Sequence, residues 1–166
     1  GLPVNRDKSE AAPVKEITFL GFQLLGGKIR VSKKAREKFK NRVRKLTRRN
    51  NGQSMYHVIQ ELNKYLRGWV GYFKIQEFKC LFRDFDRWIR SRLRSMQLKK
   101  WKKPKKFQRI MIKAGIDPHE AHQTWVRMST WRSVMRREVR FVMDLKWFRK
   151  QGVVFLHDFT QAAPKS

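Results

Sequence analysis

Three consecutive stretches of the chain repeat their apolar residues at the spacing of an α-helix. In the first, residues 33–49, the apolar residues lie four, four and three apart: Ala35, Phe39, Val43 and Leu46. The stretches at 55–75 and 77–98 carry wider stripes of the same period, rich in Phe, Leu and Trp. A stripe of this kind leaves water only by packing on another element. The pattern therefore predicts three helices packed together, with the second as the central one.

Lys and Arg occupy nearly all of the remaining positions on the first of these helices and many of those on the third. The chain holds 41 Lys and Arg against 13 Asp and Glu among 166 residues, a formal net charge of +28, whereas solubility alone needs about 2–8. Six Trp and twelve Phe supply apolar surface for a core. The charge then lies on a folded surface, where it repels itself until a polyanion neutralises it. Nucleic acid is the predicted partner; a solvated surface and a membrane surface are the weaker alternatives.

A short β-hairpin is predicted in front of the helices. Residues 17–31 are largely apolar up to Gly26-Gly27, a dipeptide that takes the positive φ angles of a tight turn. The return strand alternates basic and apolar residues, as a half-buried strand does. Residues 1–16 read as a loop. Ser32 is suited to cap the helix that follows, and Ser54 is suited to cap the second helix.

The junction after the third helix interrupts the pattern. Six lysines surround Trp101 and Pro104 over residues 99–106, and proline together with like charges predicts a loop there. Within the second helix, Gly68 and Gly71 mark either the close approach of another backbone or a local kink or helix end.

The last third of the chain is less regular. A short helix is predicted over 107–114, and Asp117 opens another, with Pro118 and Glu120 in suitable places behind it. One or two further helices follow. The apolar segment 153–159 is expected to pair or pack back, and the remaining residues form a polar tail.

Several residues of types that bind metals or take part in catalysis are present, but without the further residues that such a site needs. His119 and His122 form a pair that binds zinc only with further ligands, and none is evident nearby. Asp84 and Asp86 are interpreted as ion-pair partners of neighbouring arginines. Cys80 is the single cysteine; we expect it in the core and infer a reducing compartment. No metal site and no catalytic set is predicted.

The chain begins in the middle of a pattern, at Gly1-Leu2-Pro3, and without Met. We therefore expect a piece of something longer. No run approaches the 18 or more apolar residues of a membrane span, so no membrane partner is predicted. We expect a bacterial cytoplasmic protein, with an organelle as the alternative.

Four blocks of sequence form a recognisable series. They are Phe19-Leu20-Gly21-Phe22 followed by residues 27–32, the stretch 62–73 (LNKYLRGWVGYF), residues 88–94, and residues 101–105. The series resembles the C-terminal part of group II intron-type reverse transcriptases, and 62–73 is similar to the signature of their maturase-specific (X, or thumb) domain. Residues 5–9 resemble the segment just before the hairpin. The resemblance covers roughly 2–159 and is most specific over 17–105.

The resemblance implies a mainly α fold in three parts. Residues 1–31 are the end of the polymerase palm with the primer-grip hairpin, in which Phe19, Leu20, Gly21 and Phe22 hold the primer. Residues 32–106 are a three-helix thumb that clamps the template–primer duplex and binds intron RNA to assist splicing. Residues 107–166 are a basic helical region for which DNA binding is one interpretation. Lys8 matches the palm lysine that assists the leaving group.

The same resemblance implies that catalysis lies elsewhere. The family's Tyr-x-Asp-Asp and its partner aspartate hold metal ions, and two-metal phosphoryl transfer needs such carboxylates. The chain contains no Asp-Asp, so we expect it to be inactive alone. The expected partners are intron RNA, template–primer duplex, a DNA target and the upstream fingers and palm, with magnesium at the palm site.

The candidate contacts to nucleic acid are basic residues of the hairpin, the first and third helices and the junction. They are Lys28, Arg30, Lys33, Lys34, Arg36, Lys40, Arg44, Arg48, Arg87, Arg90, Arg94, Lys102, Lys103, Lys105 and Lys106. Arginine suits this role because its planar fork pairs with phosphate at two points. Trp101 is added as a stacking residue, and packing against the bundle is its alternative.

Two other functions stay open at this stage. One is a free-standing maturase-like splicing factor that binds RNA and has no polymerase activity. The other is the thumb of a related reverse transcriptase that works in repair or phage defence, since a thumb meets a duplex in either setting.

Overall fold

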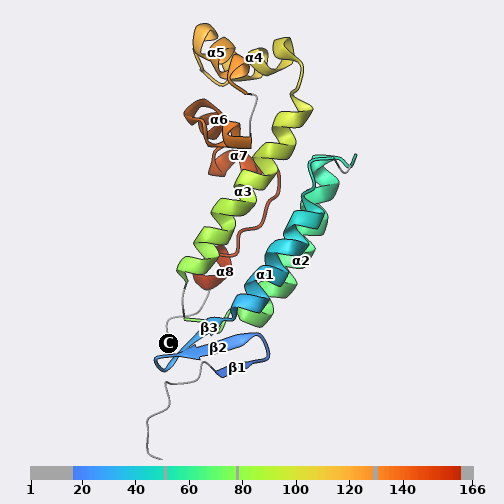
Figure 1. The fold of residues 1–166 in the computed structure, drawn as a ribbon. Helices are drawn as coiled ribbons and strands as arrows, with labels where there is room; N and C mark the ends of the chain where they lie inside the picture. The colour runs from blue at the N-terminus through green and yellow to red at the C-terminus, as the bar shows by residue number, and fades with distance from the viewer. Residues whose placement is uncertain (1–16, 51, 78, 129–130, 162–166) are drawn as a thin grey trace, which may run out of the picture.

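Three long helices and a small sheet form the first two thirds of the computed structural model, which describes residues 17–50, 52–77, 79–128 and 131–161. The helices α1 (Lys33–Leu46), α2 (Met55–Phe73) and α3 (Cys80–Lys100) run side by side, and the sheet lies across one end of α1 and α2 (Figure 1). Shorter helices follow α3 at its far end and along its other side. The predicted mainly α fold is confirmed, whereas the predicted division into three parts stays a prediction.

The sheet has three strands, where the sequence predicted two. Strands β1 (Ile17–Phe19), β2 (Phe22–Leu25) and β3 (Lys28–Val31) pair antiparallel in the order β1-β2-β3. The prediction of one continuous strand up to Gly26 was wrong because the chain reverses at Leu20-Gly21, where φ is +50° and +85°. A side chain in place of the Gly21 hydrogen would come within 3.2 Å of the Phe73 ring. The predicted turn at Gly26-Gly27 is confirmed, with φ of +55° and +76°.

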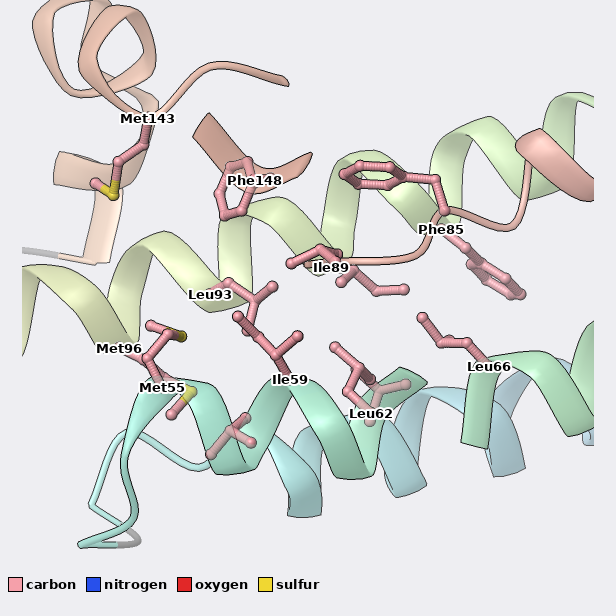
Figure 2. Close-up of a cluster of buried hydrophobic side chains, with 14 of the residues drawn as sticks. Met55, Ile59, Leu62, Leu66, Phe85, Ile89, Leu93, Met96, Met143 and Phe148 are labelled. Atoms are coloured by element: carbon pink, nitrogen blue, oxygen red, sulfur yellow. The ribbon is translucent and has the colours of Figure 1, made fainter. Parts of the chain in front are cut away.

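The bundle core forms where the apolar stripes of the helices meet. Buried side chains of α2 face those of α3, and Met143 and Phe148 pack on the opposite side of α3 (Figure 2). Phe39 of α1 stacks on Phe85 of α3, with ring centroids 4.4 Å apart, and reaches Trp69 of α2 at 4.5 Å. The stripe positions predicted from the sequence therefore fall in the core.

Side-chain caps define where α1 and α2 begin. The Ser32 hydroxyl accepts a hydrogen bond from Ala35 N at 3.2 Å, and the Ser54 hydroxyl accepts one from His57 N at 3.1 Å. Helix α1 ends at Leu46, three residues before its predicted end, where the Thr47 hydroxyl donates to the Val43 carbonyl. Both predicted caps are confirmed.

Helix α3 begins at Cys80, later than its predicted start at residue 77. Glu77 is held by strand β3 instead: its N–H donates to the Ile29 carbonyl at 3.0 Å, and its carboxylate accepts from Ile29 N at 3.3 Å. Cys80 is exposed, so its predicted place in the core was wrong. Of the two interpretations of Gly68 and Gly71, the structure does not support the close approach of another backbone, since a Cβ at either position would meet no atom within 4 Å beyond the helix itself.

The predicted loop at 99–106 is mostly helix. Helix α3 continues to Lys100, and α4 (Pro104–Lys113) starts with its proline in the first helical turn. That position tolerates proline because its missing N–H would have no helical partner there. Only residues 101–103 connect the two helices, and Trp101 is buried against Trp147.

The last part of the described chain consists of short helices. They are α5 (Pro118–Val126), the 3₁₀ helix η1 (Trp131–Met135), α6 (Arg137–Val142), α7 (Leu145–Lys150) and α8 (Asp158–Gln161). The predicted cap of α5 is confirmed, because the Asp117 carboxylate accepts from His119 N and Glu120 N. None of the helices in the described ranges is long and apolar enough to span a membrane.

The apolar segment after α7 returns to the bundle, as predicted. The Asn63 side chain on α2 donates to the Gly152 carbonyl and accepts from Val154 N. The buried carboxylate of Asp86 on α3 accepts from Leu156 N and His157 N, both at 2.9 Å. Asp86 forms no ion pair among the described residues, so its interpretation as an ion-pair partner was wrong: its carboxylate holds this segment to α3.

Candidate nucleic-acid interface

One side of α1 carries a row of basic residues four apart: Lys34, Lys38 and Arg42, here called the Lys34 strip. Residues at this spacing lie above one another on a helix. All are exposed, and among the described residues none forms an ion pair. Burial raises the pKa of the Tyr65 hydroxyl on α2, and the charge of Arg42 opposes that rise, which places the strip on the α2 side of α1.

The near end of the Lys34 strip borders a hollow of about 670 Å³. Its walls come from the β1–β2 turn, α1 and α2, and they are mainly aromatic: Phe39, Tyr65, Trp69, Tyr72 and Phe73. The Tyr72 hydroxyl donates to the Leu20 carbonyl at 2.9 Å. This contact fixes the turn against α2, so Lys34 and Lys38 stand beside a rigid apolar wall.

The other side of α1 holds most of the α1 residues that the sequence singled out, and its charge is partly engaged. Lys40 pairs with Glu37 at 3.4 Å. Arg44 donates to the Asn41 side chain at 2.7 Å and lies over the Trp88 ring, 5.7 Å from its centroid. Lys33 is exposed, whereas Arg36 is half-buried.

A second basic region lies at the end of the bundle away from the sheet. It is formed by the loop after α1 and the end of α3, and we call it the bundle end: Arg48, Arg49, Lys99, Lys100, Lys102 and Lys103. Arg49 and Lys99 line two adjoining hollows of about 430 and 320 Å³. Lys99 contacts the Asn50 side chain, and Lys100 donates to the Gln53 carbonyl at 3.0 Å. Lys105 and Lys106 follow in the sequence, at the start of α4, and both are exposed.

The sheet contributes less to this surface. Lys28 is exposed and Arg30 is half-buried. Phe19 and Leu20, at the β1–β2 turn, are 70% and 66% exposed, whereas Phe22 packs on Phe73 with ring centroids 5.0 Å apart. Lys8 lies outside the described residues.

Two of the predicted contact residues are inside the fold. Arg94 is 7% exposed; its Nε and Nη2 donate to the Met143 carbonyl at 3.1 and 2.8 Å. Trp101 is 6% exposed, so its alternative role, packing against the bundle, is the one the structure shows. We remove both from the candidate interface, because neither side chain offers the open face that a phosphate or a base needs.

Three other arginines of α3 also have partners within the protein. Arg87 pairs with Asp84 at 3.5 Å on the surface, as the sequence predicted for Asp84. Arg90 is half-buried and lies over the Phe155 ring at 5.6 Å. Arg92 donates to the Thr47 hydroxyl and to the Arg44 and Thr47 carbonyls. Arg90, Arg92 and Arg94 thus join α3 to other elements of the fold, whereas the Lys34 strip on α1 has no ion pair among the described residues.

Sequence reasoning missed five residues of this surface: Lys38, Arg42, Arg49, Lys99 and Lys100. The last two belong to the lysine run noted in the sequence but were not named as contacts. The signal for the first two was present, since the i, i+4 spacing from Lys34 runs along the edge of the buried stripe. Arg49 had no comparable signal. Its place depends on the early end of α1 and on the late end of α3, which bring it beside Lys99.

A mainly helical bundle with open rows of positive charge defines the class of protein: a basic helical domain with surfaces suited to a polyanion. Residues 36–115 match the family model of the group II intron maturase-specific domain. Over these residues the chain is a maturase-specific domain, which confirms the resemblance seen in the sequence for this part. The match runs from α1 to the end of α4 and leaves out the sheet and the short helices from α5 on. No curated protein matches the chain.

Proposed function

We propose that this chain binds the folded RNA of a group II intron through the Lys34 strip and the bundle end, and so assists splicing. The observation that carries the proposal is that Lys38 and Arg42, which lie within the residues that match the maturase-specific domain, are exposed and form no ion pair among the described residues. Lysine and arginine side chains in rows bind phosphates and release condensed counterions, which supplies most of the affinity for nucleic acid. Double-stranded RNA is read mainly through its shape and backbone, and such rows are suited to that.

The geometry supports contacts at several points along one RNA surface. The Lys34 strip rises about 12 Å along α1, at 1.5 Å per residue. The bundle end continues in the same direction, because it begins at the loop where α1 ends (Figure 1). Charge set out along a rigid helix fixes the orientation of a bound RNA, which a cluster on a mobile loop does not.

A second candidate function is the thumb of a reverse transcriptase that clamps a template–primer duplex. The exposed Phe19 and Leu20 favour it, since two large apolar side chains on a fixed turn are suited to contact with another protein part. The expected neighbours are the fingers and palm, whose aspartates would hold magnesium. In this proposal the chain positions the duplex and takes no part in the chemical step.

One experiment separates the two candidates. The affinity of the chain is measured over a range of salt concentrations for a folded group II intron RNA, an unrelated structured RNA of equal length and an RNA–DNA duplex. A preference for the intron that survives high salt supports recognition of intron RNA. Equal and steeply salt-dependent binding to all three supports a general duplex clamp. Weak binding to all three would contradict both.

A further inference from the structure

A second basic site lies on the opposite side of α3 from α1, where η1, α6 and α7 pack (Figure 1). These elements and α3 enclose a hollow of about 500 Å³, a size typical of sites for small ligands. Four arginines line it: Arg90, Arg94, Arg137 and Arg140. We call it the arginine hollow. The elements that close it lie beyond residue 115, outside the family match.

The charge of this hollow is unbalanced. Asp144 is the one acidic residue in its lining, and its carboxylate already accepts a hydrogen bond from Trp147 N at 2.8 Å to cap α7. Burial lowers the pKa of Arg94 to about 10; repulsion from Arg90 and Arg140 adds to the effect, and the charge of Asp144 opposes it. Burial also lowers the pKa of Arg90, although Asp86 opposes it. An anion in the hollow would relieve this repulsion.

The floor of the hollow is fixed by the fold. Arg94 is held by its two hydrogen bonds to the Met143 carbonyl and lies over the Phe148 ring at 5.2 Å. Arg90 lies over the Phe155 ring at 5.6 Å. Because these two guanidinium groups are held in place by the fold, the shape and charge of the hollow are set before a ligand binds, and the site is preorganised.

The rim is apolar and open to solvent. Phe141 is 61% exposed, and Met135 and Leu145 are also exposed beside it. Exposed aromatic rings beside cationic groups are the arrangement by which proteins hold unpaired bases: the ring stacks on the base while the cations bind the phosphates. A duplex does not offer a base face to such a ring, because its bases are stacked within the helix.

We propose that the arginine hollow binds an unpaired nucleotide of a single-stranded nucleic acid, with its phosphates on Arg137 and Arg140 and its base on Phe141. The site is separate from the Lys34 strip in both position and chemistry. It gives the residues beyond the family match a binding role of their own. RNA and DNA offer the same phosphate and base, and the experiment distinguishes them.

The test uses the full chain and labelled strands of about eight nucleotides, a length within the usual range for such sites. Single-stranded RNA, single-stranded DNA and a duplex of the same length are compared at several salt concentrations. We expect F141A to weaken single-strand binding about tenfold with no change in salt slope, since one stacked base is lost. R140Q should weaken it and flatten the slope by about 0.7, the value for one phosphate contact on a single strand.

A matched control keeps the test specific to the hollow. Arg109 on α4 is exposed and does not line the hollow, so R109Q removes the same charge elsewhere. Equal effects of R109Q and R140Q, with F141A unchanged, would overturn the proposal in favour of a general basic surface. Tighter binding of RNA than of DNA, or the reverse, identifies the strand. A duplex bound as tightly as the single strands, and weakened equally by F141A, would also overturn it.

A local readout separates this site from the Lys34 strip. A strand that carries 5-iodouracil forms a photocrosslink to an aromatic ring stacked on that base. We expect the crosslink in the tryptic peptide of residues 141–146, which contains Phe141 as its only aromatic residue. Crosslinks found only in other peptides would contradict the assignment, even if the affinities of the variants had changed.

Discussion

Helices α1 and α3 are both rich in Lys and Arg, yet they use these residues in different ways. On α1 the Lys34 strip is exposed and has no ion pairs among the described residues. On α3, Arg92 and Arg94 donate to main-chain carbonyls of other elements, and Arg90 stacks on a ring. The count of charges on a helix therefore does not locate an interface.

The difference follows from where each helix lies. Helix α1 has a neighbour on one face, whereas α3 has α1 and α2 on one side and α6 and α7 on the other (Figures 1 and 2). Carbonyls near the ends of neighbouring helices lack helical partners. Thr47 O closes α1 and Met143 O closes α6, and an arginine of α3 reaches each. On a central helix, arginine acts as a cap for its neighbours.

The strongest test of this comparison is R94M, which keeps the length of the side chain and removes its donors. The Met143 carbonyl would lose both hydrogen bonds in a buried place, so we expect the free energy of unfolding to fall by about 3–4 kcal/mol. Chemical denaturation measures it. K38M on α1 is the matched control and should change stability by less than about 0.5 kcal/mol. Equal losses in the two variants would contradict the contrast between the helices.

A second prediction concerns the carboxylate that α3 uses in the same internal way. Burial raises the pKa of Asp86 to about 6, against 3.8 for a free side chain, although the hydrogen bonds from His157 N and Leu156 N lower it. Since the folded pKa lies above the unfolded one, the fold favours the protonated form. Stability from this group is then complete below pH 4 and is lost as the pH rises through 6, by up to about 3 kcal/mol.

The measurement is the unfolding free energy of the protein and of D86N between pH 4 and pH 8. The difference between the two proteins removes the contribution of other titrating groups. We expect the wild-type protein to lose stability relative to D86N as the pH rises. A constant difference across this range would show that Asp86 stays charged and that its two backbone hydrogen bonds outweigh the cost of burial.

R92M should have a smaller effect than R94M. Arg92 is half-buried, and water reaches part of the site where it holds the Thr47 and Arg44 carbonyls. The freed carbonyls can turn to water, so we expect a loss of about 1–2 kcal/mol. The same denaturation series checks it. A loss as large as that of R94M would mean that the end of α1 unravels without this cap.

The contrast between these helices also shows what the sequence alone reveals. The apolar stripes predicted α1, α2 and α3 because helical periodicity is a local property that tertiary packing then uses. Ser32, Ser54 and Asp117 predicted helix starts for the same reason, since a cap acts within three residues. The last residue of α1 and the first residue of α3 were predicted wrongly, because other contacts determine them. The Thr47 hydroxyl bonds back to its own helix at the end of α1, and Glu77, before α3, is bound to a strand residue 48 positions away.

The candidate interface was harder to predict than the fold. Arg94 and Lys38 look alike in the sequence, as basic residues beside an apolar stripe. What separates them is the Met143 carbonyl, which is brought to Arg94 from 49 residues away. The arginine hollow was missed for the same reason, because Arg90 meets Arg140 only after the chain has returned along α3. Contacts between residues so far apart in the sequence cannot be predicted from the spacing of residues within one helix.

The smallest effect on stability, and the largest on binding, is expected when the Lys34 strip is neutralised as K34Q/K38Q/R42Q. These side chains support no fold contact comparable to that of Arg94, so the unfolding free energy should change by less than about 0.5 kcal/mol per site, and relief of repulsion could raise it. Three lost phosphate contacts should flatten the salt slope for folded intron RNA by about 2–3 units. The control K113Q/K146Q/K150Q removes the same charge from α4 and α7, away from the strip. If both triple variants flatten the salt slope equally, RNA binding depends only on the net charge of the protein. The Lys34 strip would then not be a specific binding surface, and the proposed difference in function between α1 and α3 would be contradicted.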